Sequence, residues 1–375
     1  MAVYQDPLDG AVVSAEALLT WTKALLERIG TPPDIAEDVA EVLVASDLRG
    51  ISSHGTARLA QYLKLVSADV LDPSARPVKE KGKPAIARFN ANNGWGQHAA
   101  RIATDDAMER AGELGAAISI VRNNNHYGIA GWYAMRMARR GLIGVSLTNA
   151  GAMVAPTRSR VRMLGTNPIS VAAPAGRFGM VVLDMATSTV PRGRIEVAAR
   201  RGESIPRGWA IAPDGSAALT PEAALAGALQ PLGGEEETGG YKGYGLALIV
   251  EMLTGVLGNA TCGPHIMGLF STAGNSDLGQ FLMAIDPAAI EGDDGFESRL
   301  ESLLLDLTSA PRTPNAPGPV LYPGQPEAER SAYQEAHGIA LDRSVYDSLA
   351  ALALEHVVPF PAVSALPRDT RVAAE

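Results

Sequence analysis

The sequence contains a single cysteine, Cys262, and no Cys-x-x-Cys or clustered Cys/His spacing. One thiol cannot form an internal disulfide, and a structural zinc site needs several clustered ligands. A reducing compartment therefore fits the chain, and we expect no bound metal.

Long apolar runs are also missing. The most apolar stretch, residues 243–257, is interrupted by Glu251 and Thr254 before it reaches the ~20 apolar residues that a membrane span requires. The first ten residues, MAVYQDPLDG, lack the basic and apolar regions of a secretory signal. We therefore expect a cytoplasmic protein with no membrane partner.

Aromatic residues make up only 5% of the 375 residues, and acidic side chains outnumber basic ones by 41 to 32. The net charge of -9 disfavours nucleic acid as a partner, because neutralising a phosphate backbone needs a basic face. Apolar residues are abundant at 46%, together with 39 glycines and 25 prolines. This composition is typical of a folded, loop-rich α/β enzyme that acts on a small molecule.

Apolar spacing predicts helices at both ends of the chain and a sheet between them. The first three helices are expected from an N-cap at Ser14 to Gly30, from Thr31 to about Gly50, and from about Thr56 to Val66. The predicted strands lie at 85–89, 117–121, 142–148, 169–173, 180–183 and 280–285, and the helices between and after them at 97–114, 129–140, 243–257, 327–337 and 343–355. We expect the terminal helices, residues 1–80 with 320–375, to form one helical lobe beside a central sheet domain of residues 81–319.

The segment GWGQHA at residues 94–99 matches the dinucleotide pattern G-x-G-x-x-G/A. The pattern requires its first glycine directly after a buried strand, whereas the polar residues 90–93 intervene here. We interpret this segment as a turn followed by a helix start.

Ser53-His54-Gly55 is the strongest candidate for chemistry, because a histidine can transfer a proton near neutral pH and a flanking glycine lets a ligand approach the backbone. Arg58 follows one helical turn later and can hold a substrate carboxylate beside His54. The alternative is an ordinary surface loop. Asp47 and Arg49 of the same segment can also be explained without a chemical role, as an ion pair at the end of a helix.

Three further segments lie where predicted strands end or helices begin. His126, in NHYG at 125–128, is a candidate for catalysis or cofactor contact, or is a member of a capping loop. Asp184, in LDMATS at 183–188, can orient an imidazole or be part of an ordinary turn. Lys242, in GGYKGYG at 239–245, lies at a glycine-rich helix start that suits a pyrophosphate or is only a helix start.

These segments resemble one protein family when they are read in order. The matching strings are DLRGISSHG at 47–55, NHYG at 125–128, GTNP at 165–168, LDMATS at 183–188, IPRGWA at 205–210, PLGG at 231–234, KGYGL at 242–246 and YPGQ at 322–325. Together they resemble the type-2 malate/L-lactate dehydrogenase family over about residues 12–355. The resemblance implies a non-Rossmann α/β fold with a mixed sheet, a nicotinamide cofactor carried by the central sheet domain, and a homodimer with its active site between lobes.

The resemblance also implies roles for residues. It makes His54 the acid/base on the substrate oxygen and His126 the alternative proton acceptor, so which histidine acts stays open. Ser53 and Arg58 match substrate-side positions, and Asp184 matches an active-site aspartate. The positions that match cofactor contacts are Asp184, Met185, Ala186, Thr187, Lys242, Gly243, Gly324 and Gln325.

The family implies an NAD(P)-dependent enzyme that interconverts a small 2-oxo acid and a 2-hydroxy acid of malate or lactate type by hydride transfer. The alternative within the family is a reductase of cyclic imino acids such as piperideine- or pyrroline-2-carboxylate, and a non-catalytic binding protein is a third reading. The chain departs from the family pattern at Arg192-Gly-Arg194, at Trp209-Ala-Ile-Ala212 and in the insertion-like segment 235–240. These departures bear on which substrate is used.

The dinucleotide is the least determined feature. Arg158, Arg160 and Arg162 alternate in sequence, and on an extended chain all three would face one side and suit the 2'-phosphate of NADP. The alternative is a solvated basic strand edge, and the acidic residues 235–237 act against a phosphate if they lie nearby. We expect NADP(H) to be slightly favoured over NAD(H).

Overall fold

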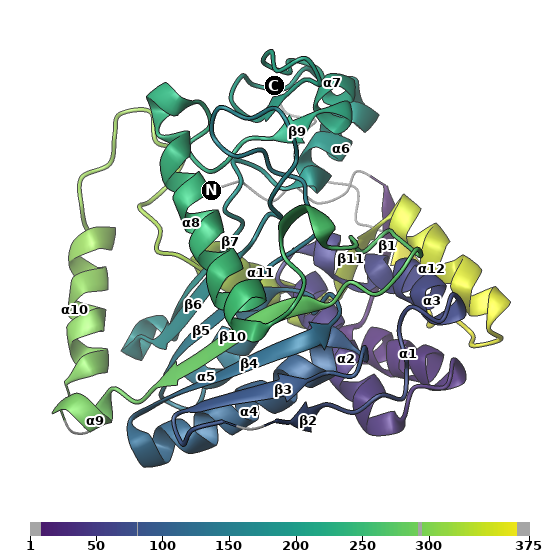
Figure 1. Cartoon of the computed structure of the whole chain (residues 1–375), viewed down its shortest axis with the longest axis horizontal. Coiled ribbons are helices and arrows are strands. Elements are labelled where there is room, and N and C mark those ends of the chain that lie inside the picture. The colour runs from purple at the N-terminus through teal and green to yellow at the C-terminus, as the bar shows by residue number, and fades with distance from the viewer. Residues whose placement is uncertain (1–8, 81, 292–294, 366–375) are drawn as a thin grey trace. The chain divides into compact units, whose positions relative to one another are not determined.

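The computed structural model describes residues 9–80, 82–291 and 295–365. It divides into two compact units, one made of the residues up to Ser74 together with those from Gln325 onward, and one made of Ala75–Gly324 (Figure 1). That these units are functional domains, with the boundaries expected at residues 80 and 319, stays a prediction. Residues 1–8 and 366–375, which belong to the expected helical lobe, lie outside the described residues. Most of the ten residues that lack the pattern of a secretory signal therefore lie outside them too.

The second unit is built on a seven-stranded sheet with strand order β2-β3-β4-β10-β5-β6-β7. β3 and β4 pair in parallel, whereas the other neighbouring pairs of this sheet are antiparallel. A Rossmann sheet is mostly parallel, so this order confirms the expected non-Rossmann mixed sheet. The strands are β2 Val78–Lys79, β3 Ile86–Asn90, β4 Ala116–Asn124, β5 Ile143–Thr148, β6 Ile169–Pro174, β7 Met180–Met185 and β10 Leu278–Ile285.

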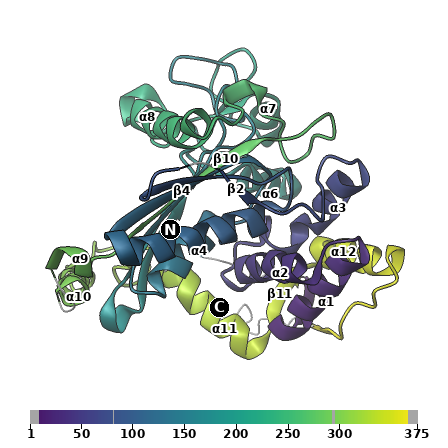
Figure 2. The same cartoon turned by 60° about the horizontal axis from the view of Figure 1, so that its bottom comes forward.

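Helices cover both faces of this sheet. Figure 2 shows α4 (Gly96–Leu114) and α8 (Gly240–Glu251) on opposite sides of the strands, and α5 (Ala130–Ala138) packs on β5 and β6. The predicted helix at 243–257 begins earlier, at Gly240, and changes to a π-helical segment at Met252–Val256. Such π segments are rare and often lie at functional sites.

The core on the α8 face is a row of apolar side chains across three strands. Phe281 of β10 lies between Ile120 of β4 and Leu147 of β5 in the strand register, and Val250 of α8 packs against this row. The alternation of buried residues along the strands produces this face, because successive side chains point to opposite sides of a sheet.

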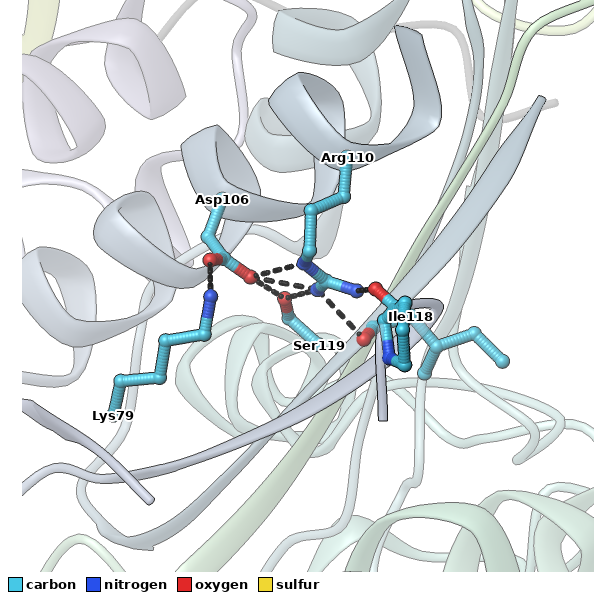
Figure 3. Close-up of polar contacts among 6 residues, drawn as sticks. Lys79, Asp106, Arg110, Ile118 and Ser119 are labelled. Atoms are coloured by element: carbon cyan, nitrogen blue, oxygen red, sulfur yellow. Dashed lines mark hydrogen bonds and ion pairs between the residues drawn. The ribbon is translucent and has the colours of Figure 1, made fainter. Parts of the chain in front are cut away.

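Polar contacts join α4 to the strands β4 and β2, as Figure 3 shows. Arg110 and the hydroxyl of Ser119 both donate to Asp106 Oδ2, and Arg110 Nη2 also reaches the carbonyl of Ile118 at 2.9 Å. Lys79 of β2 pairs with the same aspartate. Helix α4 is therefore fixed to β4 and β2 by charged groups as well as by its apolar face.

The remaining elements of the second unit were not among the predicted ones. α6 and α7 enclose, with β8 and β9, a small apolar core that contains Val154, Ile195 and Leu229. Their bounds are α6 Arg192–Arg201, α7 Pro221–Ala226, β8 Ala210–Ile211 and β9 Ala228–Leu229, and two further helices are α9 Ala288–Glu291 and α10 Phe296–Thr308.

The first unit is helical, as expected, and joins both ends of the chain. The Ser14 hydroxyl accepts a hydrogen bond from the Ala17 amide at 3.1 Å and so caps the first helix, as predicted. A small three-stranded sheet that was not predicted pairs β1 with β11 and β12. The elements are β1 Gly10–Val13, α1 Ala15–Arg28, α2 Pro33–Leu48, α3 Leu59–Ser67, α11 Gln325–His337, β11 Ile339–Asp342, α12 Arg343–Glu355 and β12 Ser364–Ala365.

Within the described ranges, no helix is long and apolar enough to cross a membrane. Across the same ranges, no three His, Cys, Asp or Glu side chains lie together as ligands for a metal ion.

Candidate active site

The first candidate segment lies in the connection between α2 and α3. Two short 3-10 turns, Ser52–His54 and Thr56–Arg58, follow the end of α2, and α3 begins only at Leu59. The predicted helix from Thr56 therefore starts with a 3-10 turn, and His54 and Arg58 lie on successive 3-10 turns of one short segment. We call residues 51–58 the histidine turn.

Side-chain contacts fix the geometry of the histidine turn. His54 Nδ1 lies 2.9 Å from the Ser53 hydroxyl oxygen, and Arg58 Nε donates to the Ser53 carbonyl oxygen at 2.5 Å. Loss of solvation, followed by the positive charge of Arg58, lowers the pKa of His54 to about 4. The imidazole is therefore neutral near pH 7, which is the form that can accept a proton, with a guanidinium beside it.

The Asp47 side chain does not take part in the salt-bridged helix end considered from the sequence. Its Oδ2 accepts hydrogen bonds from the backbone nitrogen and the hydroxyl of Thr56, at 2.9 and 2.7 Å. The carboxyl thus lies under the histidine turn.

His126 lies in the second unit, on the connection between β4 and α5. The neighbouring Tyr127 is fully buried, stacks on Tyr133 with ring centroids 4.7 Å apart, and shares a hydrogen bond with the Ser146 hydroxyl at 3.1 Å. Burial, followed by the nearby charge of Asp184, raises the pKa of Tyr127, so its phenol stays protonated. This aromatic pair anchors the loop that presents His126.

The dinucleotide-like segment at 94–99 has a structural role. A Cβ on Gly96 would overlap the backbone carbonyl oxygens of Asn125 and His126, so only glycine allows α4 to start against this loop. The Asn125 amide donates to the Gly94 carbonyl at 2.9 Å and closes the contact. The interpretation as a turn and helix start agrees with this packing.

Asp184, at the end of β7, lies against the start of α5. Its Oδ2 accepts a hydrogen bond from the Gly131 backbone nitrogen at 2.8 Å, where a helix N-terminus favours negative charge. His126 precedes the same helix, and the Gly128 nitrogen approaches His126 Nδ1 at 3.4 Å. The structure thus brings both residues to one end of α5.

The predicted cofactor residues of the second unit lie at the end of β7, on the loop that follows it, at the start of α8 and, for Gly324, beside β7. The segments from 165 to 243 contact one another. Thr187 Oγ1 donates to the carbonyl oxygens of Thr166 and Asn167 at 3.0 and 3.1 Å, and the Thr187 carbonyl accepts from the Leu232 nitrogen at 2.8 Å. A Cβ on Gly243 would overlap the Leu232 backbone. The strings GTNP, LDMATS, PLGG and KGYG therefore form one loop cluster, which includes Met185 and Ala186.

Lys242 is exposed in the first turn of α8, with its Nζ 5.8 Å from the centre of the Tyr241 ring. Its side chain and the positive end of the helix dipole suit a phosphate group, although the Gly240 and Lys242 nitrogens already donate to the carbonyl oxygens of Glu235 and Gly239, at 2.9 Å each.

The segment YPGQ divides between the two units. Gly324 has φ +89° and packs directly on Val182 of β7, whose nitrogen donates to the Pro323 carbonyl at 3.0 Å. Gln325 begins α11 in the first unit, and its side-chain amide donates to Glu329 at 2.7 Å. The structure therefore places Gly324 on the edge of β7, whereas the Gln325 amide is used within its own helix.

The arginine triplet does not have the expected arrangement. Arg158 lies in a turn with φ +69° and forms two hydrogen bonds to the Glu236 carboxylate, at 2.9 and 2.6 Å. Arg162 donates instead to the carbonyl oxygens of Leu225 and Gly227, at 2.7 and 2.6 Å. The expectation that all three guanidiniums face one side of an extended chain is wrong, because separate partners far along the chain hold them.

The comparisons with known proteins identify the family. The family model of malate/L-lactate dehydrogenases matches residues 13–350. A malate dehydrogenase of Pyrococcus abyssi is 39% identical over 307 residues, which are 81% of this chain and 83% of that protein. The structure of malate dehydrogenase from Entamoeba histolytica has a TM-score of 0.89 at 29% identity, covering 94% of this chain and 99% of that one. The chain belongs to the malate/L-lactate dehydrogenase family. It is an oxidoreductase, as the resemblance implied.

Members of this family differ in substrate and dinucleotide. A Δ1-piperideine-2-carboxylate reductase from Pseudomonas syringae is similar in structure, with a TM-score of 0.81 at 30% identity over 91% of this chain and 99% of that one. Two relatives carry a dinucleotide in their names. They are a (2R)-3-sulfolactate dehydrogenase (NADP(+)) from Chromohalobacter salexigens, 32% identical over 92% of this chain and 99% of that protein, and a ureidoglycolate dehydrogenase (NAD(+)) from Escherichia coli K12, 31% identical over 91% and 96%.

Proposed function

We propose that this chain interconverts a small 2-oxo acid and its 2-hydroxy acid, with a nicotinamide dinucleotide as the redox partner. The observation that carries the proposal is the histidine turn, in which a neutral imidazole and a guanidinium are held side by side through Ser53. A 2-hydroxy acid carries its reacting hydroxyl next to its carboxylate. The turn offers a proton acceptor for the first group and a cation for the second.

His54 has the protonation state that oxidation requires. With a pKa of about 4 the ring is neutral, so it can take the proton of the 2-hydroxyl group. In the direction of reduction the ring must first take up a proton, which it then gives to the new alkoxide. A carboxylate on Arg58 favours that uptake, because it offsets the positive charge that helps to lower the pKa of His54.

The loop cluster of the second unit fits the dinucleotide. Following the family resemblance, we assign dinucleotide binding to Asp184, Met185, Ala186, Thr187, Lys242 and Gly243 of this cluster. The resemblance adds Gly324 and Gln325, which are not part of the cluster. When bound, the nicotinamide ring accepts or supplies the hydride. Lys242 and the positive end of the α8 dipole suit the pyrophosphate, and Asp184 is held in place by the start of α5.

His126 is the second candidate for the proton step. Its loop is fixed by the buried Tyr127, and it borders the same helix start as Asp184. We assign the proton step to His54, because Arg58 provides a site for the substrate carboxylate beside it. The NHYG segment around His126 contains no arginine or lysine.

Reduction of a cyclic imino acid is the second candidate function, and the similarity to a piperideine-2-carboxylate reductase favours it. The two reactions share the carboxylate site and the dinucleotide. They differ at the reduced atom pair, because a C=O bond needs a proton at oxygen and a C=N bond needs one at nitrogen.

Titration with NADH and NADPH by nicotinamide fluorescence, followed by rate assays on a panel of 2-oxo and cyclic imino acids, tests the proposal. We expect dinucleotide binding and turnover of a 2-oxo acid. Binding without turnover of any acid would contradict the proposed function, and absence of dinucleotide binding would contradict the assignment of the dinucleotide to the loop cluster.

We propose NADP(H) as the favoured dinucleotide, with the exposed guanidiniums of Arg158 and Arg160 as the candidate contacts for a 2'-phosphate. Arg158 is paired with Glu236, and Arg207 is paired with Glu235 at 2.7 Å. A 2'-phosphate would have to compete with these carboxylates. The ratio of kcat/KM for NADPH over NADH tests the preference, and a ratio below one contradicts it.

The homodimer also stays a proposal, as does the cytoplasmic location. A row of large apolar side chains, each about half exposed, follows one side of α8 and its π segment and supports self-association. The row consists of Tyr241, Leu248, Ile249, Met252, Val256 and Leu257. Sedimentation at micromolar concentration tests the dimer, and a single species of 39.1 kDa would contradict it.

A further inference from the structure

We infer that Asp47 is a positioning residue whose buried carboxyl holds the histidine turn in the geometry that turnover requires. The inference rests on the proposed function, because it assigns the turn a part in the reaction. Asp47 lies in the last turn of α2, is only 3% exposed, and acts through the residues of the turn.

The first support is the pair of hydrogen bonds to Thr56. Asp47 Oδ2 accepts from both the backbone nitrogen and the hydroxyl of Thr56, and the Thr56 side chain is fully buried. Thr56 lies midway between His54 and Arg58 in the chain. One carboxylate oxygen therefore fixes the centre of the turn that carries both side chains.

The second support is the close packing of Gly55 on the same carboxyl. Gly55 has φ -90° and ψ -151°, a backbone conformation open to any residue. A Cβ at this position would nevertheless overlap the Asp47 carboxyl group. The glycine of the Ser-His-Gly sequence is thus required by Asp47 and not by its own backbone angles.

The third support is the anchoring of Asp47 itself. Gln334 of α11 donates its side-chain amide to the carbonyl oxygens of Asp47 and Leu48, both at 2.8 Å, and its own oxygen accepts from the Ala340 nitrogen at 3.0 Å. Carbonyl groups at a helix end otherwise lack intrahelical partners. The C-terminal segment therefore holds the end of α2, and Asp47 connects that fixed point to the turn.

Three variants test the assignment through a comparison of kcat/KM for a 2-oxo acid with the Kd of the dinucleotide. Asp47→Ala removes the acceptor for both Thr56 bonds and is expected to lower kcat/KM by about 10- to 100-fold, because a misplacement on the order of 1 Å is that costly. Asp47→Asn keeps a carbonyl oxygen that can accept both bonds and should restore kcat/KM to within about threefold of the wild type. The dinucleotide Kd should stay unchanged in both.

Ser46→Ala is the matched control. Ser46 is the chain neighbour of Asp47, is fully buried, and donates its hydroxyl to Val42 of its own helix at 2.7 Å. Loss of the Ser46 hydroxyl should lower the melting temperature without lowering kcat/KM. The kinetic and binding measurements are made on variants that circular dichroism shows to be folded.

Gly55→Ala keeps the test decisive if Asp47→Ala does not fold. The added methyl group should displace the carboxyl and lower kcat/KM as Asp47→Ala does, and combining the two changes should add little, because the missing carboxyl leaves room for the methyl group.

A kcat/KM of Asp47→Ala within about twofold of the wild type, or equal losses in Asp47→Ala and Asp47→Asn, would overturn the inference. Gly55→Ala with wild-type kinetics would overturn it as well. Failure of the proposed function is distinct, since it appears as absence of turnover in the wild type itself.

Discussion

The two segments that carry the candidate chemistry are held in different ways. The histidine turn depends on side chains, with Asp47 beneath it and Gln334 behind the end of α2. The loop cluster of the second unit is joined largely through its backbone, with the Leu232 nitrogen bonded to the Thr187 carbonyl and Gly243 packed on the Leu232 backbone, beside the hydrogen bonds of the Thr187 hydroxyl. Both segments should therefore be sensitive to a methyl group added at a packed glycine, whereas removal of a buried carboxyl group should disturb the histidine turn alone.

The largest effect is expected at the proton-transfer group. His54→Ala should lower kcat by ~10² to 10⁴, because it removes the positioned acid/base, while the dinucleotide Kd changes little. Steady-state rates and a fluorescence titration measure the two quantities. His126→Ala is the parallel variant, and a near-normal kcat for His54→Ala together with a large loss in His126→Ala would reverse the assignment.

A smaller effect is expected at the carboxylate site. Arg58→Lys should raise KM for the 2-oxo acid by about 10- to 100-fold, because an ammonium cannot offer the two-pronged contact of a guanidinium. Dinucleotide affinity should not change. An unchanged KM would place the substrate carboxylate elsewhere, with Arg49 or Arg192 as the next candidates.

The loop cluster should respond to a single added carbon. Gly243→Ala places a methyl group into the Leu232 backbone and should weaken dinucleotide binding by about tenfold, since displaced backbone cannot relax cheaply. Gly245→Ala, on the same helix with open space around it, is the control and should leave binding unchanged. Equal affinities for the two variants would contradict the expected sensitivity of the loop cluster.

The smallest effect concerns pH. Burial raises the pKa of Asp47 to about 7, above its ordinary value of 3.8. Between these values the folded state holds a proton that the unfolded state releases, so this group makes the protein less stable as pH rises from about 4 to about 7. An asparagine at position 47 does not titrate, so Asp47→Asn does not lose stability in this way. The melting temperature of Asp47→Asn minus that of the wild type should therefore increase from pH 4 to pH 8. A decrease of this difference with pH would contradict a raised pKa at Asp47.

Local patterns predicted most of the fold. The Ser14 cap, the six main strands and the helices that cover them follow from spacing within short windows. Elements without a strongly apolar face were missed, among them α6, whose sequence from Arg192 to Arg201 is rich in arginine. The small sheet of β1 and β11 was missed because its partners lie at opposite ends of the chain.

The candidate residues were predicted better than the contacts that hold them. Motif order selected His54, Arg58, Asp184 and Lys242, and the structure places each on a connection or at the end of an element. The arrangement of Arg158, Arg160 and Arg162 was predicted wrongly. Glu236, which lies 78 residues from Arg158 in the sequence, binds the guanidinium of Arg158 and fixes its position.

The role of Gly55 likewise depends on tertiary packing. Only the folded chain brings the Asp47 carboxyl against this glycine, and no sequence pattern encodes that contact.

A matched comparison of pyruvate with Δ1-piperideine-2-carboxylate under the same dinucleotide, in the wild type and in His54→Ala, tests whether His54 supplies the proton for reduction of a 2-oxo acid. We expect a higher kcat/KM for the 2-oxo acid in the wild type and its loss in the variant. Efficient reduction of the imino acid without turnover of the 2-oxo acid, or 2-oxo acid turnover that survives the loss of His54, would contradict it.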